Sequence, residues 1–176
     1  FGEGSCRVVF RVMLEAAIDF GGTLTKVIVA SRDGETRWMG PSPVRPQPSD
    51  VADLLASAGC PDPEALSLLA VTGGPSAQFS LEWEGVSVLA IDEAEATAHG
   101  GLLGGAQAPA IVVSIGTGTG IVLVREDGSF ERLIGSGIGG GTALGLARLL
   151  LGEQSVAAYG QLAAAGSVQS CDLTVG

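Results

Sequence analysis

Short apolar and β-branched runs alternate with glycine-rich turns along most of the chain. Residues 15–20 and 24–31 flank Gly21-Gly22 and predict a β-hairpin, because a glycine pair readily forms the turn between two strands. By the same pattern, further strands are predicted over residues 36–39, 67–72, 86–91, 110–115, 121–124 and 130–134.

Helices are predicted where apolar residues recur at intervals of three and four or where a capping residue precedes the segment. The predicted segments are residues 50–57, 93–103, 142–151 and 153–165. Asp92 stands just before the second segment, where its carboxylate can accept hydrogen bonds from the free N–H groups of the first turn. In the third segment Leu144, Ala147, Leu150 and Leu151 form one apolar stripe, which belongs either to the core or to an interface.

A pattern of strand, glycine-threonine turn and strand occurs twice. The first copy contains Asp19-Phe20-Gly21-Gly22-Thr23, and the second, roughly a hundred residues later, contains Ile115-Gly116-Thr117-Gly118-Thr119. Each hairpin is followed by further strands and then by helices. This repetition predicts two related α/β lobes.

Charge and composition exclude several classes of protein. The formal net charge is −10, whereas a nucleic-acid-binding surface needs a basic face and an anionic membrane would repel this chain. We expect neither nucleic acid nor a membrane as a partner, and no apolar run predicts a membrane span. The three cysteines are too widely spaced for a disulfide framework, which favours a cytoplasmic protein.

Both hairpins are candidate phosphate sites. In the first, Gly21 and Gly22 expose N–H groups, Thr23 and Thr25 add hydroxyls, Asp19 can hold Mg²⁺, and Lys26 can neutralise phosphate charge. In the second, the corresponding residues are Gly116, Thr117, Gly118 and Thr119. An ordinary tight hairpin is the alternative for each. Neither is a Walker P-loop, and neither is a Rossmann fingerprint, because a strand follows each turn.

Five segments together resemble the eukaryotic-like (type II) pantothenate kinases, within the acetate and sugar kinase, Hsc70 and actin superfamily. The segments follow the family's order and are Ile18 to Lys26, Val71 to Gly74, Asp92 to Gly100, Ser114 to Thr119 and Gly135 to Gly145. The resemblance implies an α/β, two-lobed actin-like (ribonuclease H-like) ATPase fold. It also implies ATP-dependent phosphorylation of pantothenate to 4'-phosphopantothenate, the first step of coenzyme A synthesis, with ATP and Mg²⁺ as cofactors.

Glu93 is the candidate catalytic residue. At the start of a helix it could accept a proton from a substrate hydroxyl, although acidic residues in first turns also stabilise the helix dipole. The resemblance favours the catalytic role, because the family's catalytic glutamate falls at this position. Glu95 is the competing candidate, and His99, two turns into the helix, is expected to serve as a surface or packing residue.

Arg132 and the glycine loop after it are the candidate substrate-binding residues. The resemblance implies that an arginine at this position contacts pantothenate, whose carboxylate suits a guanidinium; an exposed strand arginine is the alternative. Ser136, Gly137 and Gly139 are expected to approach substrate or phosphate at a helix N-terminus, with a flexible linker as the alternative.

The expected domains are an extension outside the core over residues 1–12, a first lobe with the phosphate hairpin and catalytic helix over residues 13–106, and a second lobe over residues 107–176. The resemblance implies that the second lobe is incomplete at its C-terminus. It also suggests a homodimer and acyl-CoA as an inhibitor. Two alternatives stay open: a sugar kinase or activator-type ATPase on the same fold, and a non-catalytic remnant.

Overall fold

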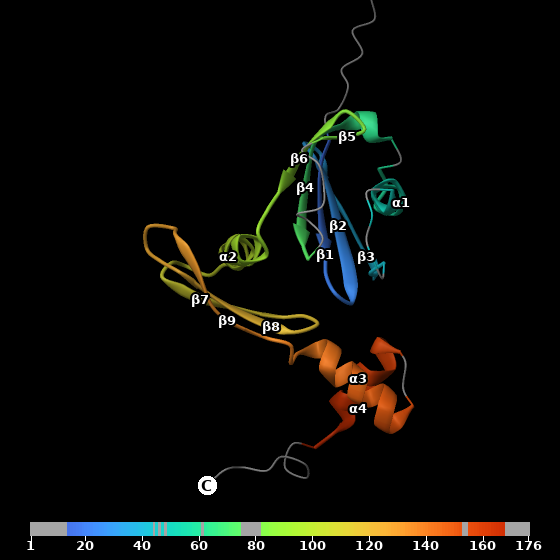
Figure 1. The fold of residues 1–176 in the computed structure, drawn as a ribbon, viewed down its shortest axis with the longest axis vertical. Coiled ribbons are helices and arrows are strands. Elements are labelled where there is room, and N and C mark those ends of the chain that lie inside the picture. The colour runs from blue at the N-terminus through green and yellow to red at the C-terminus, as the bar shows by residue number, and fades with distance from the viewer. Residues whose placement is uncertain are drawn as a thin grey trace, which may run out of the picture.

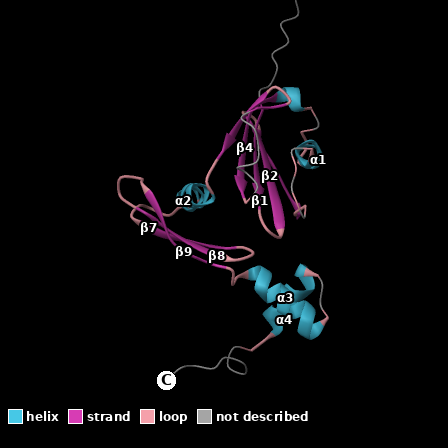
Figure 2. Cartoon of the chain, in the orientation of Figure 1, coloured by secondary structure: helices cyan, strands magenta, loops and turns pink. Residues whose placement is uncertain are grey.

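The computed structural model describes residues 14–43, 45, 47, 49–60, 62–74, 82–152 and 155–167. These residues form two β-sheets with helices around them (Figures 1 and 2). The extension expected over residues 1–12 lies outside the described residues.

The first sheet has strand order β3-β2-β1-β4-β6-β5, with β1 and β4 parallel. Its strands are β1 (Leu14–Phe20), β2 (Leu24–Ser31), β3 (Gly34–Pro41), β4 (Leu66–Gly73), β5 (Glu82–Trp83) and β6 (Val86–Ala90). One face packs against α1 (Asp50–Ser57), which lies beside the sheet in Figure 1, and a short 3₁₀ turn, η1 (Pro63–Ala65), precedes β4. The core includes Ile18 and Leu69 from the sheet and Leu55 from α1.

The second sheet contains β7 (Ala110–Ile115), β8 (Thr119–Val124) and β9 (Phe130–Ser136), paired antiparallel in that order. Both predicted hairpins therefore form: β1 and β2 meet at residues 21–23, and β7 and β8 meet at residues 116–118. We call residues 21–23 the first tip and residues 116–118 the second tip.

Helix α2 (Glu93–Leu103) lies between the two sheets (Figure 1). Asp92 caps it as predicted, accepting hydrogen bonds from the backbone N–H groups of Ala94 and Glu95 at 2.8 and 3.3 Å. Small residues let the helix approach the second sheet closely, since Ala94 and Ala98 are buried in a cluster with Val122 and Val124. The helix assigned to the first lobe thus packs largely on the second sheet.

Helices α3 (Gly140–Leu151) and α4 (Val156–Ala165) follow the second sheet and lie together below it in Figure 1. The apolar stripe predicted in α3 is divided: Leu144 and Ala147 are buried, whereas Leu150 and Leu151 are exposed. Among the described residues, every helix is too short or too polar to cross a membrane.

Candidate active site

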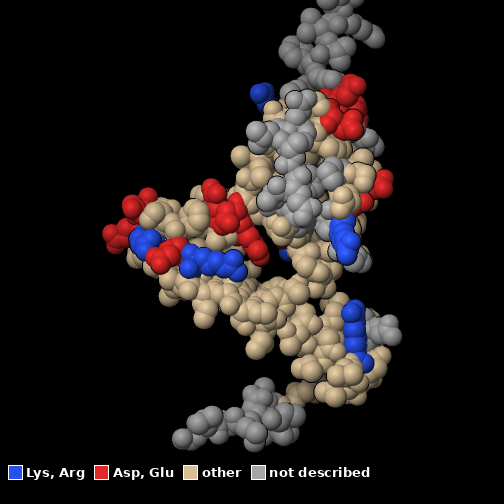
Figure 3. Space-filling model, viewed as in Figure 1, with Lys and Arg blue, Asp and Glu red and all other residues tan. Residues whose placement is uncertain are grey.

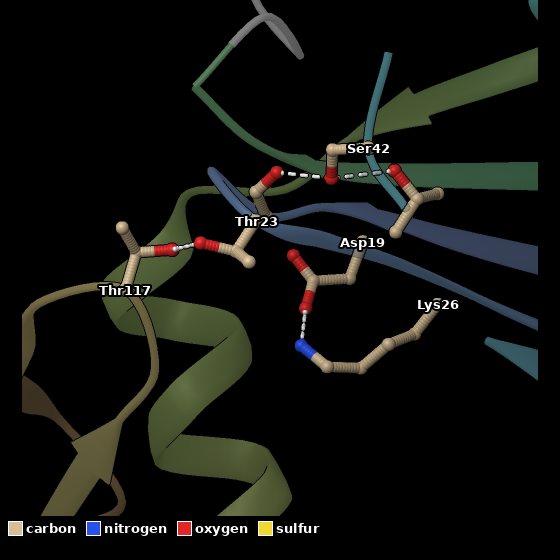
Figure 4. A network of polar contacts seen from close by, with 7 residues as sticks. Asp19, Thr23, Lys26, Ser42 and Thr117 are labelled. Atoms are coloured by element: carbon tan, nitrogen blue, oxygen red, sulfur yellow. Dashed lines mark hydrogen bonds and ion pairs between the residues drawn. The ribbon is translucent and has the colours of Figure 1, made fainter. Parts of the chain in front are cut away.

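The two tips touch each other. A hydrogen bond of 2.9 Å joins the hydroxyls of Thr23 and Thr117, which are 94 residues apart in the sequence (Figure 4). The approach is close enough that a Cβ on Gly22 would lie 3.1 Å from the Thr117 hydroxyl oxygen. The two glycine-threonine turns therefore converge from different sheets onto one place.

One cavity of about 490 Å³ lies where the tips meet. Both sheets and three helices contribute to its wall. The lining includes Asp19, Gly21, Gly22, Thr23, Lys26, Glu93, Thr97, Ser114, Gly116, Thr117, Gly118, Thr119, Arg132, Ser136, Leu144, Val156 and Tyr159. The structure thus brings together most of the residues singled out in the sequence.

Asp19 and Lys26 form an ion pair at the cavity. The Lys26 ammonium donates to Asp19 Oδ2 at 2.6 Å, and both side chains are partly exposed (Figure 4). The pairing follows from the hairpin register, which sets Asp19 of β1 directly opposite Lys26 of β2, so that both side chains leave the same face of the sheet. The site thus presents an anion and a cation side by side.

Glu93 lines the cavity, and Thr97, one turn further along α2, lines it too. Residues four apart share one face of a helix, so this face of α2 is turned toward the tips. Glu95 and His99 are absent from the lining; their side chains lie near each other, with His99 Nε2 4.0 Å from Glu95 Oε1. Glu93 is therefore the acidic residue of α2 that is placed at the cavity.

A β-bulge brings Arg132 to the cavity side of the second sheet. Ile121 pairs with Ile134, but the next residue, Val122, pairs with Arg132, so Leu133 is the extra residue in β9. Directly opposed residues point to the same face, and a shift of one residue reverses the face. Arg132 therefore shares the face of Val122, which is buried against α2, instead of the opposite face.

The Arg132 guanidinium lies against the backbone of Gly135, where a Cβ would come within 2.6 Å of its Nη2 atom. The glycine thus leaves room for the side chain to lie along the strand. Arg132 is an exposed residue at the cavity wall. Its guanidinium is therefore accessible to a ligand in the cavity.

Three of the expected site residues are absent from the cavity lining. Thr25 is fully buried, and its hydroxyl is hydrogen-bonded to the Ser42 hydroxyl at 3.0 Å. Gly137 and Gly139 lie in the loop between β9 and α3, beside the cavity wall formed by Ser136 and Gly140.

Ser42 supports the first tip and has no counterpart in the sequence-based expectations. Its hydroxyl donates to the Gly21 carbonyl (Figure 4). Its backbone N–H donates to the Thr23 carbonyl at 3.0 Å. The pairing of β2 with β3 could have revealed it, because a register that sets Ser31 opposite Gly34 and Leu24 opposite Pro41 brings Ser42 alongside Thr23. Tyr159 and Val156 of α4 were also missed, since helix periodicity alone does not say which sheet a helix approaches.

Charged side chains of both signs gather near the cavity. Figure 3 shows acidic side chains over α2 and basic side chains over the neighbouring strands of the second sheet, whereas the part formed by α3 and α4 carries few charges. Arg132 at the cavity wall can pair with an anionic group of a substrate.

The fold is that of the actin-like ATPases, so the predicted two-lobed fold is confirmed. Component A of (R)-2-hydroxyglutaryl-CoA dehydratase from Acidaminococcus fermentans is similar with a TM-score of 0.61, at 18% identity over 88% of this chain and 60% of that one. The ethanolamine utilization protein EutJ from Carboxydothermus hydrogenoformans is similar with a TM-score of 0.59, at 15% identity over 85% of this chain and 60% of that one.

Residues 105–176 match the Fumble family, which confirms the resemblance to type II pantothenate kinases over this part of the chain. Pantothenate kinase 1 of Oryza sativa subsp. japonica is 48% identical over 68 residues, which are 39% of this chain and 10% of the relative. The chain therefore spans about a tenth of this curated relative.

Proposed function

We propose that the protein transfers the γ-phosphoryl group of ATP to the primary hydroxyl of pantothenate, which forms 4'-phosphopantothenate and opens coenzyme A synthesis. One observation carries the proposal: the two glycine-threonine tips meet at a cavity that Glu93 and Arg132 also line. The similarity to proteins named pantothenate kinases supports this choice of substrate.

Glu93 is the proposed general base. As the substrate oxygen bonds to the γ-phosphorus and the bond from that phosphorus to the β–γ bridging oxygen breaks, the hydroxyl proton passes to the Glu93 carboxylate and ADP leaves. Arg132 is proposed to bind the pantothenate carboxylate through paired N–H groups. Phosphoryl transfer depends mainly on positioning and charge neutralisation, which suits a site built from rigid strand ends.

The backbone N–H groups and hydroxyls of both tips are proposed to hold the phosphates, together with Lys26. Asp19 is the proposed Mg²⁺ ligand. Among the described residues no group of three or more His, Cys, Asp or Glu side chains could hold a metal unaided. A single carboxylate nevertheless fits Mg²⁺, which is commonly held by one or two carboxylates and the substrate phosphates. When bound, the ion would neutralise charge on the phosphate oxygens.

The proposal extends to the cellular setting. A cytoplasmic location agrees with the wide spacing of the cysteines. The exposed leucines of α3, including Leu149 and Leu150, support a homodimer, because exposed apolar groups of this kind often mark an interface. Acyl-CoA is proposed as an inhibitor on the family resemblance alone.

The direct test is to incubate the protein with ATP, Mg²⁺ and pantothenate and to identify the product by mass spectrometry. We expect ADP formation that depends on pantothenate and a product heavier by one phosphoryl group. ADP formation that is indifferent to pantothenate but rises with a sugar would contradict the assigned substrate. Absence of both ATP binding and turnover in a folded protein would support the non-catalytic alternative.

Replacing Arg132 with lysine is expected to raise the KM for pantothenate by about 10- to 100-fold, because an ammonium cannot reproduce the paired hydrogen bonds of a guanidinium. The KM for ATP should stay close to that of the parent protein. Arg125→Lys is the matched control, since Arg125 pairs with Glu131 and does not line the cavity. Steady-state kinetics with each substrate varied would decide, and equal effects of the two substitutions would refute the role of Arg132.

A further inference from the structure

The second tip is hydrogen-bonded to the first residues of α3. The backbone N–H of Gly140 donates to the Gly116 carbonyl at 2.8 Å, and the N–H of Gly141 donates to the Thr117 carbonyl at 3.2 Å. A third bond joins the neighbouring segments, since the Thr119 hydroxyl donates to the Ile138 carbonyl at 2.7 Å. The tip is thus held along its length by the loop and helix that follow β9.

These bonds occupy donors that a helix start usually leaves free. The first N–H groups of an α-helix have no partner within the helix and commonly bind anions. Here the N–H groups of Gly140 and Gly141 are directed to tip carbonyls, and the N–H of Gly139 donates to the Thr142 hydroxyl at 3.3 Å. The N–H groups at the start of α3 therefore bind the protein's own second tip.

The contact is so close that side chains do not fit between the two segments. A Cβ on Gly139 would overlap the Gly118 carbonyl and lie 2.8 Å from the Gly118 Cα. A Cβ on Gly141 would lie 2.8 Å from the Thr117 methyl group and 3.0 Å from the Thr117 carbonyl oxygen. The φ angle of Gly139 is −169°, an extended value open to any residue, so space and not backbone conformation requires glycine there.

We propose that Gly139 and Gly141 are positioning residues that set the second tip for its phosphate ligand. Gly139 lies outside the cavity lining and does not contact pantothenate, whereas Gly141 is part of the lining. The proposal rests on the proposed kinase function. The positioning effect reaches the first tip as well, because the hydroxyl of Thr117 is hydrogen-bonded to the hydroxyl of Thr23. The start of α3 thereby fixes the distance between the two tips. A displaced second tip would lower the affinity of the site for polyphosphate.

The test is Gly139→Ala in the full-length protein. Because small displacements of positioning groups have large kinetic effects, the KM for ATP should rise about 10- to 100-fold. The dissociation constant for tripolyphosphate, measured by calorimetry, should rise by a similar factor, while the KM for pantothenate stays unchanged. A rise in the KM for pantothenate alone would overturn the proposal and restore the expectation that Gly139 binds substrate.

Gly145→Ala is the matched control, because Gly145 lies within α3 and the added Cβ would meet nothing within 4 Å beyond its chain neighbours and the adjacent backbone of its own helix. It should leave both KM values and tripolyphosphate binding unchanged. Thermal unfolding checks that each variant folds, and Gly141→Ala replaces Gly139→Ala if the latter does not. Unaltered tripolyphosphate binding in a folded Gly139 or Gly141 variant would also refute the proposal.

Tripolyphosphate binding also separates this inference from the proposed function. A protein that binds tripolyphosphate but leaves pantothenate unphosphorylated would contradict the kinase assignment, and the glycine variants would still be compared by binding. A parent protein without any affinity for tripolyphosphate would overturn the positioning proposal itself.

Discussion

Glu93→Gln is expected to lower kcat by about 100- to 10,000-fold, the range typical for loss of a general base. Glutamine keeps the size and hydrogen-bonding shape of the side chain but cannot accept the hydroxyl proton. Glu93 lines the cavity but belongs to neither tip. The substitution should therefore leave the phosphate-holding groups in place. The affinity for ATP should therefore remain close to that of the parent protein, and quenched-flow or steady-state assays would measure the loss in kcat.

Glu95→Gln is the control for this prediction. Glu95 belongs to the same helix and the same first turn, but it does not line the cavity and lies near His99. We expect nearly full activity. Full activity in the Glu93 variant would contradict its role as general base. So would a loss of kcat of about 100- to 10,000-fold in the Glu95 variant alone.

Gly73→Ala is expected to lower the free energy of unfolding by about 3 kcal/mol or more. Gly73 ends β4 with a φ of +96°, which side chains rarely adopt, and a Cβ there would overlap the carbonyl of Phe20 on β1. The substitution would push apart two parallel strands immediately before the first tip. Denaturant or thermal unfolding would measure the change, with a fall in Tm of roughly 6 to 12 °C for a chain of this size.

Gly74→Ala is the neighbouring control. Gly74 has no positive φ, and apart from Gly74 itself and its chain neighbours no described atom lies within 4 Å of a Cβ at that position. Its stability should match that of the parent protein. If the two alanine variants were equally stable, the close approach of β4 to the end of β1 would not be what requires glycine.

Much of the fold follows from local patterns. Apolar and β-branched runs between glycine-rich turns located every strand except β5, and Asp92 marked the start of α2 correctly. Alternation also contained information that the phosphate hypothesis overlooked: Thr25 shares the face of Val27 and Val29, all three of which are buried, whereas Lys26 points the other way. The buried position of Thr25 was thus available from the period of the strand.

Other features depend on contacts that no local pattern encodes. The face on which Arg132 lies is decided by the bulge at Leu133, and nothing in the run of residues 130–136 indicates an extra residue. Helix α3 was predicted from Thr142 but begins at Gly140, because the second tip supplies carbonyl partners for the N–H groups of Gly140 and Gly141. Glycines disfavour a helix on their own, so only the tertiary contact explains this earlier start.

The proposed kinase mechanism requires that both tips hold the same polyphosphate. The direct measurement is a titration of ¹⁵N-labelled protein with Mg²⁺ and a non-hydrolysable ATP analogue, following the backbone amides of residues 21–23 and 116–118. Both sets of amide signals should shift together, with one shared dissociation constant. Shifts confined to one tip, or two different dissociation constants, would contradict the mechanism.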